Sequence, residues 1–365
     1  MKKLLSSLDE GTQKLVLIFI RILIVLFVLI IFFIIISSCS NKKGNHSKLE
    51  NVILDATQKY YNAKENELPQ EIGSSKKITI SELISSEYMK PVTNYIDDTT
   101  CDGYTLVTKT ASDYQYNVVL TCQDYKTNTL DKAIMKDLTE SEDGLYAGID
   151  EYYYRGNILN NYVQIGKTLF RIISIDTDNK VKLIKEESNR YSTIWDDRYN
   201  NDTNNEKSGI NQLSRSYIIE ELNNEFNEED DVIIKNYALL HDWCSSKVDE
   251  SKAEIKKPEC DSTAKSYYGI INLYEYARAS IDENCNTLFS GSCKNYNFIN
   301  DIFQEPNFTL SVVSDNSYEV YTVYSYGLTR NEVARTSKIT EVMYINGENT
   351  ISSGDGSKEN PYILK

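Results

Sequence analysis

The sequence predicts an α+β protein that begins with a membrane helix and continues as two extracytoplasmic modules. One apolar run occupies residues 15–36 and is interrupted only by Arg21. Beyond it, short runs of β-branched and aromatic residues alternate with turn-forming residues, which is typical of strands in hairpins. All seven cysteines lie beyond the run, and six of them fall into three local couples. Hydrophobic content of 41% is sufficient for globular cores.

The apolar run places the N-terminus of the chain at a membrane. A helix over residues 15–36 would be about 33 Å long, enough to cross a bilayer core of about 30 Å. Basic residues precede the run, as in a cytoplasmic n-region covering residues 1–14. The run ends in a sequence that resembles a bacterial lipobox, in which the thiol of Cys39 accepts a lipid. Residues 15–38 are therefore either a transmembrane anchor or a lipoprotein signal segment.

In both cases the chain is anchored in the cell membrane at its N-terminus, and the bulk of it is extracytoplasmic. Residues 39–48 form a polar and basic linker.

With Cys39 set aside, the remaining cysteines are Cys101, Cys122, Cys244, Cys260, Cys285 and Cys293. Local pairing is the simplest of the fifteen connectivities that six cysteines allow. Disulfides form in oxidising compartments. Three predicted disulfides therefore indicate that this part of the chain lies outside the cytoplasm. A zinc site is the alternative, but CxxC spacing is absent and only two histidines occur in the sequence.

Residues 49–129 are predicted to form a small α+β module. Apolar residues at three- and four-residue steps predict a helix over residues 49–63. A second helix is expected at Thr79–Tyr88, with Thr79 or Ser81 as its N-cap. A hairpin of two strands, Tyr104–Lys109 and Tyr114–Thr121, follows.

This module resembles the globular head of pilin-like proteins of Gram-positive bacteria. The resemblance rests on Ile80-Ser81-Glu82-Leu83-Ile84 and on Cys101-Asp102-Gly103-Tyr104 followed by a second cysteine. Pilins carry a Gly-Phe-Thr-Leu-x-Glu type processing site ahead of the apolar helix, and none precedes Leu15. The apolar run is therefore expected to be a static anchor.

An acidic connector, residues 130–146, leads into a strand-rich region over residues 147–365. Asp176–Asn179 is predicted to be a hairpin turn between strands at Leu169–Ile175 and Val181–Ile184. The remaining predictions are a strand at Tyr162–Gly166, helices at Ser214–Asn224 and Ile271–Ile281, and strands at Glu319–Tyr326, Ile339–Ile345 and Tyr362–Leu364.

This region resembles bacterial surface domains of unknown function that are similar to the C-type-lectin-like fold shared with formylglycine-generating enzymes. The motifs that carry the resemblance are Asn161-Tyr162-Val163, Phe170-Arg171-Ile172-Ile173, Trp195-Asp196-Asp197-Arg198-Tyr199-Asn200, Gly209-Ile210-Asn211, Leu273-Tyr274-Glu275-Tyr276, Phe308-Thr309-Leu310, Val342-Met343-Tyr344-Ile345, Gly354-Asp355-Gly356-Ser357 and Asn360-Pro361-Tyr362. The resemblance implies a fold rather than an activity.

Candidate chemistry in the sequence is sparse. A net charge of −15 and a pI near 4.8 argue against a nucleic-acid partner. Phosphate-binding glycine motifs are absent, no cofactor is predicted, and His241 is expected at a helix end or on the surface. Closely spaced oxygen ligands in one loop suggest calcium as an alternative to an ordinary polar loop. The candidates are Asp196, Asp197, Asn200 and Asp202.

These observations favour a membrane-anchored extracellular binding or adhesion protein over an enzyme. Its ligand would be an extracellular protein or a glycan, contacted by loops at residues 190–208 and 306–316. One alternative is a surface enzyme or maturation factor on the formylglycine-generating-enzyme-like fold. It would be favoured by a deep pocket with convergent carboxylates or a reduced thiol pair. A structural component of a pilus-like or secretion assembly is the third possibility.

Overall fold

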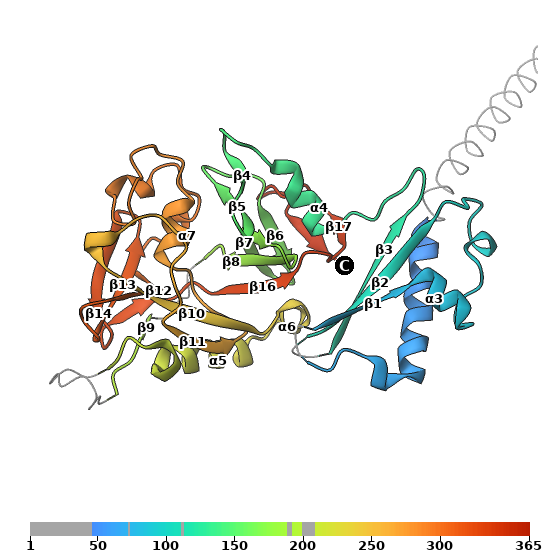
Figure 1. Cartoon of the computed structure of the whole chain (residues 1–365), viewed down its shortest axis with the longest axis horizontal. Helices are drawn as coiled ribbons and strands as arrows, with labels where there is room; N and C mark the ends of the chain where they lie inside the picture. The colour runs from blue at the N-terminus through green and yellow to red at the C-terminus, as the bar shows by residue number, and fades with distance from the viewer. Residues whose placement is uncertain (1–45, 72–73, 111–112, 188–191, 199–208) are drawn as a thin grey trace, which may run out of the picture.

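A computed structural model describes residues 46–71, 74–110, 113–187, 192–198 and 209–365 (Figure 1). The fold is α+β, composed mainly of sheets with few helices, in agreement with the sequence prediction. No helix among these residues is both long and apolar enough to cross a membrane. The predicted membrane segment at residues 15–38, and Cys39 after it, lie outside the described residues.

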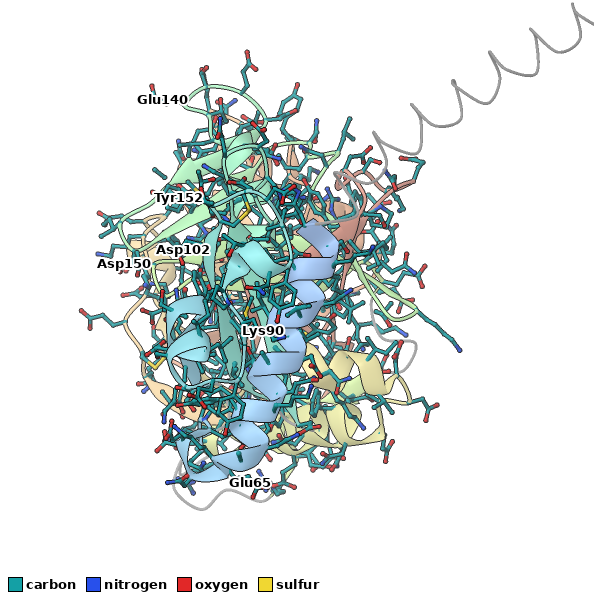
Figure 2. All side chains as sticks on the ribbon, turned by 90° about the vertical axis from the view of Figure 1, so that its right-hand side faces the viewer. Glu65, Lys90, Asp102, Glu140, Asp150 and Tyr152 are labelled. Atoms are coloured by element: carbon teal, nitrogen blue, oxygen red, sulfur yellow. A yellow bond between two sulfur atoms is a disulfide. The ribbon has the colours of Figure 1, made fainter. Side chains whose placement is uncertain are left out.

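Residues 46–127, the N-terminal unit, consist of a helix packed on a three-stranded antiparallel sheet. The described part of the helix covers residues 46–63 and buries Leu49, Ile53 and Ala56 against the sheet, because these positions share one helical face. Figure 2 shows this helix in front of the sheet, with Glu65 just beyond its lower end. The strands are β1 (Ser75–Thr79), β2 (Asp102–Lys109) and β3 (Tyr114–Thr121), in the order β1-β2-β3.

The predicted second helix of this unit is α3 (Ile80–Ser85). Thr79 is its N-cap, and Thr79 and Glu82 form a capping box, so one of the two predicted caps is confirmed. The helix ends earlier than the predicted Tyr88, and Glu87 adopts a positive φ of 63° just after it. Strand β1 was not predicted, because its sequence Ser-Lys-Lys-Ile-Thr contains one buried residue and otherwise faces solvent.

Residues 128–365, the C-terminal unit, contain two sheets that share one hydrophobic cluster. The eight-stranded sheet has the order β16-β8-β7-β6-β18-β17, and β5 joins β4 to β7. The predicted hairpin turn at Asp176–Asn179 is confirmed, with Asn179 at a positive φ of 63°. The strands are β4 (Gly144–Ala147), β5 (Glu151–Arg155), β6 (Tyr162–Ile165), β7 (Thr168–Asp176), β8 (Lys180–Lys185), β16 (Val342–Asn346), β17 (Ile351–Ser353) and β18 (Tyr362–Leu364).

The second sheet of the C-terminal unit has the order β11-β10-β12-β13-β14, with β15 joining β12 to β9. Its strands are β9 (Ser192–Ile194), β10 (His241–Val248), β11 (Ser262–Ser266), β12 (Asn307–Val313), β13 (Glu319–Tyr324), β14 (Gly327–Glu332) and β15 (Thr336–Lys338). The helices are α4 (Leu130–Ile134), α5 (Tyr217–Glu228), α6 (Val232–Tyr237) and α7 (Leu273–Arg278). Helices α5 and α7 correspond to the predicted helices at Ser214–Asn224 and Ile271–Ile281.

The two units are joined by polar contacts from the turn that follows β16 and from Lys365, which follows β18. The Glu348 carboxylate accepts a hydrogen bond from the Tyr104 hydroxyl at 3.0 Å and lies 3.2 Å from the Lys77 ammonium. Asn349 accepts a hydrogen bond from Asn117 at 2.9 Å. The Lys365 ammonium lies 3.0 Å from the carboxylate of Glu50, which is 4% exposed. These contacts fix the N-terminal unit against the C-terminal unit.

Candidate functional site

The six cysteines of the described residues are all oxidised. The bonds are Cys101–Cys122, Cys244–Cys260 and Cys285–Cys293, so the predicted local pairing is confirmed. The first closes the hairpin of β2 and β3, the second joins β10 to the segment before β11, and the third lies beyond α7. A reduced thiol pair is therefore absent from the described part of the chain.

One group of potential metal ligands lies in the N-terminal unit. His46, Asp98, Cys101 and Cys122 have ligand atoms within 4.8 Å of one another. Both sulfurs belong to one disulfide, and a cysteine binds a metal as a free thiolate. The His46 ring stacks on Tyr125 with centroids 4.5 Å apart. This group therefore offers a metal no more than two free ligands.

Among the calcium candidates, Asp196 has a structural role. Its side chain is 1% exposed, and Oδ1 accepts hydrogen bonds from Arg198 Nε at 2.7 Å and from the Tyr217 backbone N–H at 3.1 Å. Oδ2 accepts one from the Ile210 N–H at 2.9 Å. The carboxylate thus joins both ends of the loop and the first turn of α5. Asp197 is exposed.

Asn200 and Asp202 lie outside the described residues, so calcium binding by this loop stays a prediction.

The predicted ligand-contact region at residues 306–316 requires correction. Asn307–Val313 is β12, and all seven of its residues are buried. Only the segment after β12 remains a loop, and it lines an open polar hollow of about 650 Å³ together with Ile210 and Lys247.

A smaller cavity, with a volume of about 270 Å³, lies where the two sheets of the C-terminal unit meet α7. We call it the Lys182 cavity. Its wall is formed by residues of β5, β7, β8, β10, β12, β16 and α7 and by the segment at residues 257–258. These segments are far apart in the sequence, and five carboxylates and two lysines converge here.

The floor of the cavity is an ion pair between Lys182 on β8 and Glu275 on α7. The side chains are 5% and 8% exposed. Burial favours the neutral amine, but the charge of Glu275 outweighs it and holds the pKa of Lys182 above its ordinary value. Glu275 also accepts a hydrogen bond from the N–H of Asn272 at 3.0 Å, which closes the capping box of α7. The carboxylate is therefore held at two points.

A second ion pair supports the side of the cavity. Arg278 binds Glu151 through both terminal nitrogens of its guanidinium, at 2.5 and 3.0 Å. The side chain of Arg278 is 4% exposed and lies over the rings of Tyr153 and Tyr274, with 4.3 and 4.7 Å to their centroids. Although burial opposes ionisation, the guanidinium lowers the pKa of Glu151. Neither Glu151 nor Glu275 is free to act as a base.

His241 lines the cavity from β10, beside Trp243 and Tyr344. The ring centroids of His241 and Tyr344 are 4.1 Å apart, and those of His241 and Trp243 are 5.0 Å apart. Burial, with a contribution from the charge of Lys182, lowers the pKa of His241 from 6.5 to about 3. Within the described residues, neither imidazole nitrogen makes a hydrogen bond. His241 is thus a neutral imidazole, in which one nitrogen is a donor and the other an acceptor.

The expectation that His241 lies at a helix end or on the surface was wrong, since it is half-buried in a strand. Sequence reasoning also missed Lys182 and Glu275. The available signal was Lys182 itself, a charged residue inside the apolar strand Val181–Ile184. A lysine at such a position requires a buried partner, because an isolated charge is costly to bury. The sequence offers many carboxylates and does not identify which one it is.

Carboxylates also surround the mouth of the cavity. Asp150 pairs with Lys257 at 3.2 Å, and both side chains are more than half exposed. Asp176 accepts a hydrogen bond from the N–H of Lys180 at 2.8 Å, and burial raises the pKa of its carboxyl group. Hydroxyl groups of a ligand would find acceptors here and aromatic faces further in. The arrangement suits binding of a small polar molecule more than nucleophilic chemistry.

Comparison of the chain with protein-family models, curated proteins and solved structures finds no match.

Proposed function

We propose that this chain is a membrane-anchored extracellular binding protein, in which a pilin-head-like unit carries a C-type-lectin-like unit. The apolar run at residues 15–36 supports the anchor, and the three disulfides support an external location. Whether the anchor is a protein helix or a lipid on Cys39 is a separate question that labelling answers.

The proposed ligand is a glycan, held through one terminal sugar in the Lys182 cavity. The observation that carries this proposal is the neutral, half-buried imidazole of His241, whose two nitrogens lack partners among the described residues. A sugar hydroxyl both donates and accepts, and it satisfies such a pair. Tyr274 and Tyr344 also line the cavity and contribute aromatic surface for the sugar carbons. A volume of about 270 Å³ suits a small ligand, since pockets for drug-sized ligands span roughly 300–1,000 Å³.

A glycan array probed with the full-length chain in detergent tests this function. We expect binding to a restricted set of glycans with a shared terminal sugar. His241→Ala should weaken that binding about tenfold, as expected for the loss of one hydrogen bond of about 1.4 kcal/mol. Asp178→Ala is the control, because its side chain is 79% exposed at the neighbouring hairpin turn. A chain that binds no glycan, or a His241→Ala variant that binds as well as wild type, would contradict the proposal.

A surface enzyme on the same fold is the second candidate. The observation that favours it is the convergence of Lys182, His241 and Glu275 in one cavity. Against it, the carboxylates of Glu151 and Glu275 are both held in ion pairs. Mass spectrometry of a bound glycan after prolonged incubation with the protein distinguishes the two, because an enzyme alters its ligand and a binding protein releases it unchanged.

A further inference from the structure

Strand β3 is an edge strand whose outer backbone groups lack partners over its first half. In the three-stranded sheet it pairs with β2 alone. At its far end the carbonyl of Leu120 accepts a hydrogen bond from the N–H of Thr127 at 2.9 Å, and its N–H donates to the Thr127 hydroxyl at 2.9 Å. The backbone groups of Leu120 therefore point away from β2.

Along an antiparallel strand, the backbone N–H and carbonyl groups of every second residue point outward, away from the paired strand. By this alternation the N–H and carbonyl of Tyr114, Tyr116 and Val118 face outward as Leu120 does. At the other end the carbonyl of Asp113 accepts a hydrogen bond from the N–H of Thr110 within the hairpin, which fits the same alternation. Among the described residues no hydrogen bond reaches the outer backbone groups of Tyr114, Tyr116 or Val118.

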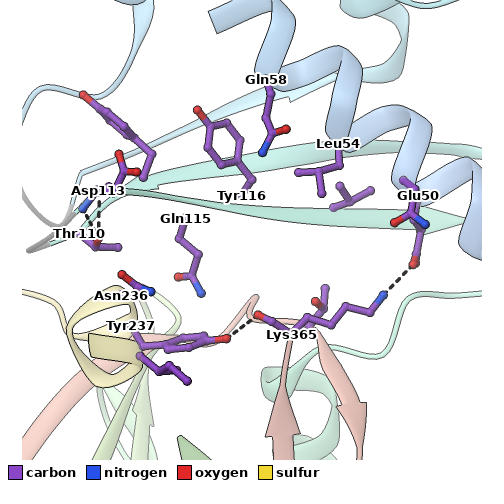
Figure 3. A pocket seen from close by; sticks show the side chains of 15 residues that line it. Glu50, Leu54, Gln58, Thr110, Asp113, Gln115, Tyr116, Asn236, Tyr237 and Lys365 are labelled. Carbon is purple, nitrogen blue, oxygen red and sulfur yellow. Dashed lines mark hydrogen bonds and ion pairs between the residues drawn. The ribbon is translucent and has the colours of Figure 1, made fainter. Parts of the chain in front are cut away.

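These unpaired groups open into a groove of about 510 Å³ between the two units (Figure 3). One wall is the helix of residues 46–63, which contributes Asn51, Leu54 and Gln58. The opposite wall belongs to the C-terminal unit and includes Ile233 and Tyr237 of α6. Lys365 lies at one end, held by its ion pair with Glu50 and by a hydrogen bond from the Tyr237 hydroxyl to its carbonyl oxygen.

We propose that this groove binds an extended polypeptide segment of another protein, which pairs with β3 as a fourth strand. Exposed strand edges attract added strands through their backbone groups. Because walls stand on both sides of the β3 edge, a single strand fits between them. The β3 edge of a second copy of this chain would carry its own two walls, which would collide with those already present.

The walls also indicate the chemistry of the segment. Side chains of a paired strand point alternately to opposite faces, so they meet Leu54 and Tyr116 on one side and Ile233 and Tyr237 on the other. Ile233 is 49% exposed in this structure, although it is strongly apolar. We therefore expect apolar side chains on both faces of the segment. A neutral or basic segment is favoured, because the chain carries a net charge of −15 and the exposed Asp113 lines the groove.

The test uses the full-length chain in detergent and a phage-displayed library of random twelve-residue peptides. Enriched peptides are synthesised and their affinities measured for wild type and for Tyr116→Pro. Proline is tolerated on an edge strand where the N–H faces outward, so the sheet should survive while pairing with a peptide is blocked. Ile233→Arg is a second variant, which places a longer side chain in the groove from a position on α6 that is 49% exposed.

We expect neutral or basic peptides with apolar residues that bind wild type at least about tenfold more tightly than either variant. A bound peptide should slow hydrogen exchange at the amides of Tyr116 and Val118. In the free protein these two amides should exchange faster than those of Gln115 and Asn117, which face β2.

Three results would overturn the inference: no enriched peptide, peptides that bind both variants as tightly as wild type, or slow exchange at Tyr116 and Val118 in the free protein. The glycan proposal concerns a different cavity. The outcome of the glycan test therefore does not affect the peptide proposal, and the outcome of the peptide test does not affect the glycan proposal.

Discussion

Lys182 and Glu275 form an ion pair in which neither side chain is more than 8% exposed, although 93 residues separate them in the chain. Lys182 belongs to the eight-stranded sheet and Glu275 to the first turn of α7. The pair therefore fixes α7 to the sheet and forms the floor of the cavity assigned to the ligand. Removing one partner leaves the other as an uncompensated buried charge, which usually costs more than the pair contributes.

Lys182→Met should destabilise the folded chain by about 3–5 kcal/mol, because Glu275 is left buried without its partner. The double variant Lys182→Met, Glu275→Gln should recover most of this loss. Glutamine has no charge and keeps an oxygen for the N–H of Asn272 in the capping box. Urea unfolding of the two variants and of wild type measures the difference. Equal instability of the single and double variants would show that the charge of Glu275 is not the cause.

His241 should make stability depend on pH in a defined window. In the folded chain its pKa lies near 3, against an ordinary value of 6.5. Below pH 6.5 the unfolded chain takes up a proton that the folded chain does not, so the free energy of unfolding falls as the pH falls. The loss continues until about pH 3. His241→Gln should remove this part of the pH dependence.

The measurement is thermal unfolding of wild type and His241→Gln at pH values from 8 to 4. As the pH falls, the melting temperature of wild type should decrease more steeply than that of His241→Gln. A parallel pair of curves would contradict the neutral state assigned to His241. NMR offers a direct check, since the imidazole resonances of His241 should not titrate between pH 8 and 5.

Much of the strand pattern could be predicted from the sequence, because turns and alternation are local signals. Strands β3, β6, β7, β8, β13 and β18 fall on the predicted segments. Strand β12 was missed, since Asn307–Val313 is buried on both faces and its polar side chains form hydrogen bonds with other segments of the fold. The Thr309 hydroxyl, for example, donates to the carbonyl of Tyr321 at 2.9 Å.

The candidate cavity was largely beyond sequence reasoning. The residues next to His241, Leu240 and Asp242, do not show whether its side chain is buried. Its burial arises from Trp243 and Tyr344, and the latter lies on a strand about a hundred residues later in the chain. The disulfides were predictable, because closely spaced cysteines need only a local contact.

Replacing Cys101 and Cys122 together with alanine should destabilise the N-terminal unit by about 2–4 kcal/mol, because the bond closes the hairpin of β2 and β3. The C-terminal unit has its own hydrophobic cluster and two further disulfides. Hydrogen exchange should therefore rise in β1, β2 and β3 and change little in β7 and β8. A uniform rise over the whole chain would indicate that the two units unfold together.

The choice between a lipid anchor and a protein anchor depends on Cys39. If the lipobox is used, cells fed radiolabelled palmitate should incorporate label into wild type and lose it entirely in Cys39→Ala. The variant should then retain residues 1–38, which intact-mass measurement detects. Unlabelled wild type that keeps its N-terminal residues would identify residues 15–38 as a transmembrane anchor.

Gly269 should be required for the position of Trp243. A β-carbon at Gly269 would lie 2.2 Å from the indole ring, far inside van der Waals contact, so Gly269→Ala must displace the ring or the backbone. Overpacking of this kind typically costs about 1–3 kcal/mol. Trp243 is 2% exposed and donates a hydrogen bond to the carbonyl of Ser266 at 2.9 Å, which leaves it little room to move.

Gly291→Ala is the matched control for Gly269→Ala, since a β-carbon there meets no atom within 4 Å. Urea unfolding should show a loss of stability for Gly269→Ala alone, and tryptophan fluorescence should shift in that variant. Because Trp243 contacts His241, a displaced indole should also weaken the binding of any ligand in the Lys182 cavity. If Gly269→Ala and Gly291→Ala behave alike in both measurements, the close packing of Trp243 against Gly269 is not a determinant of the cavity.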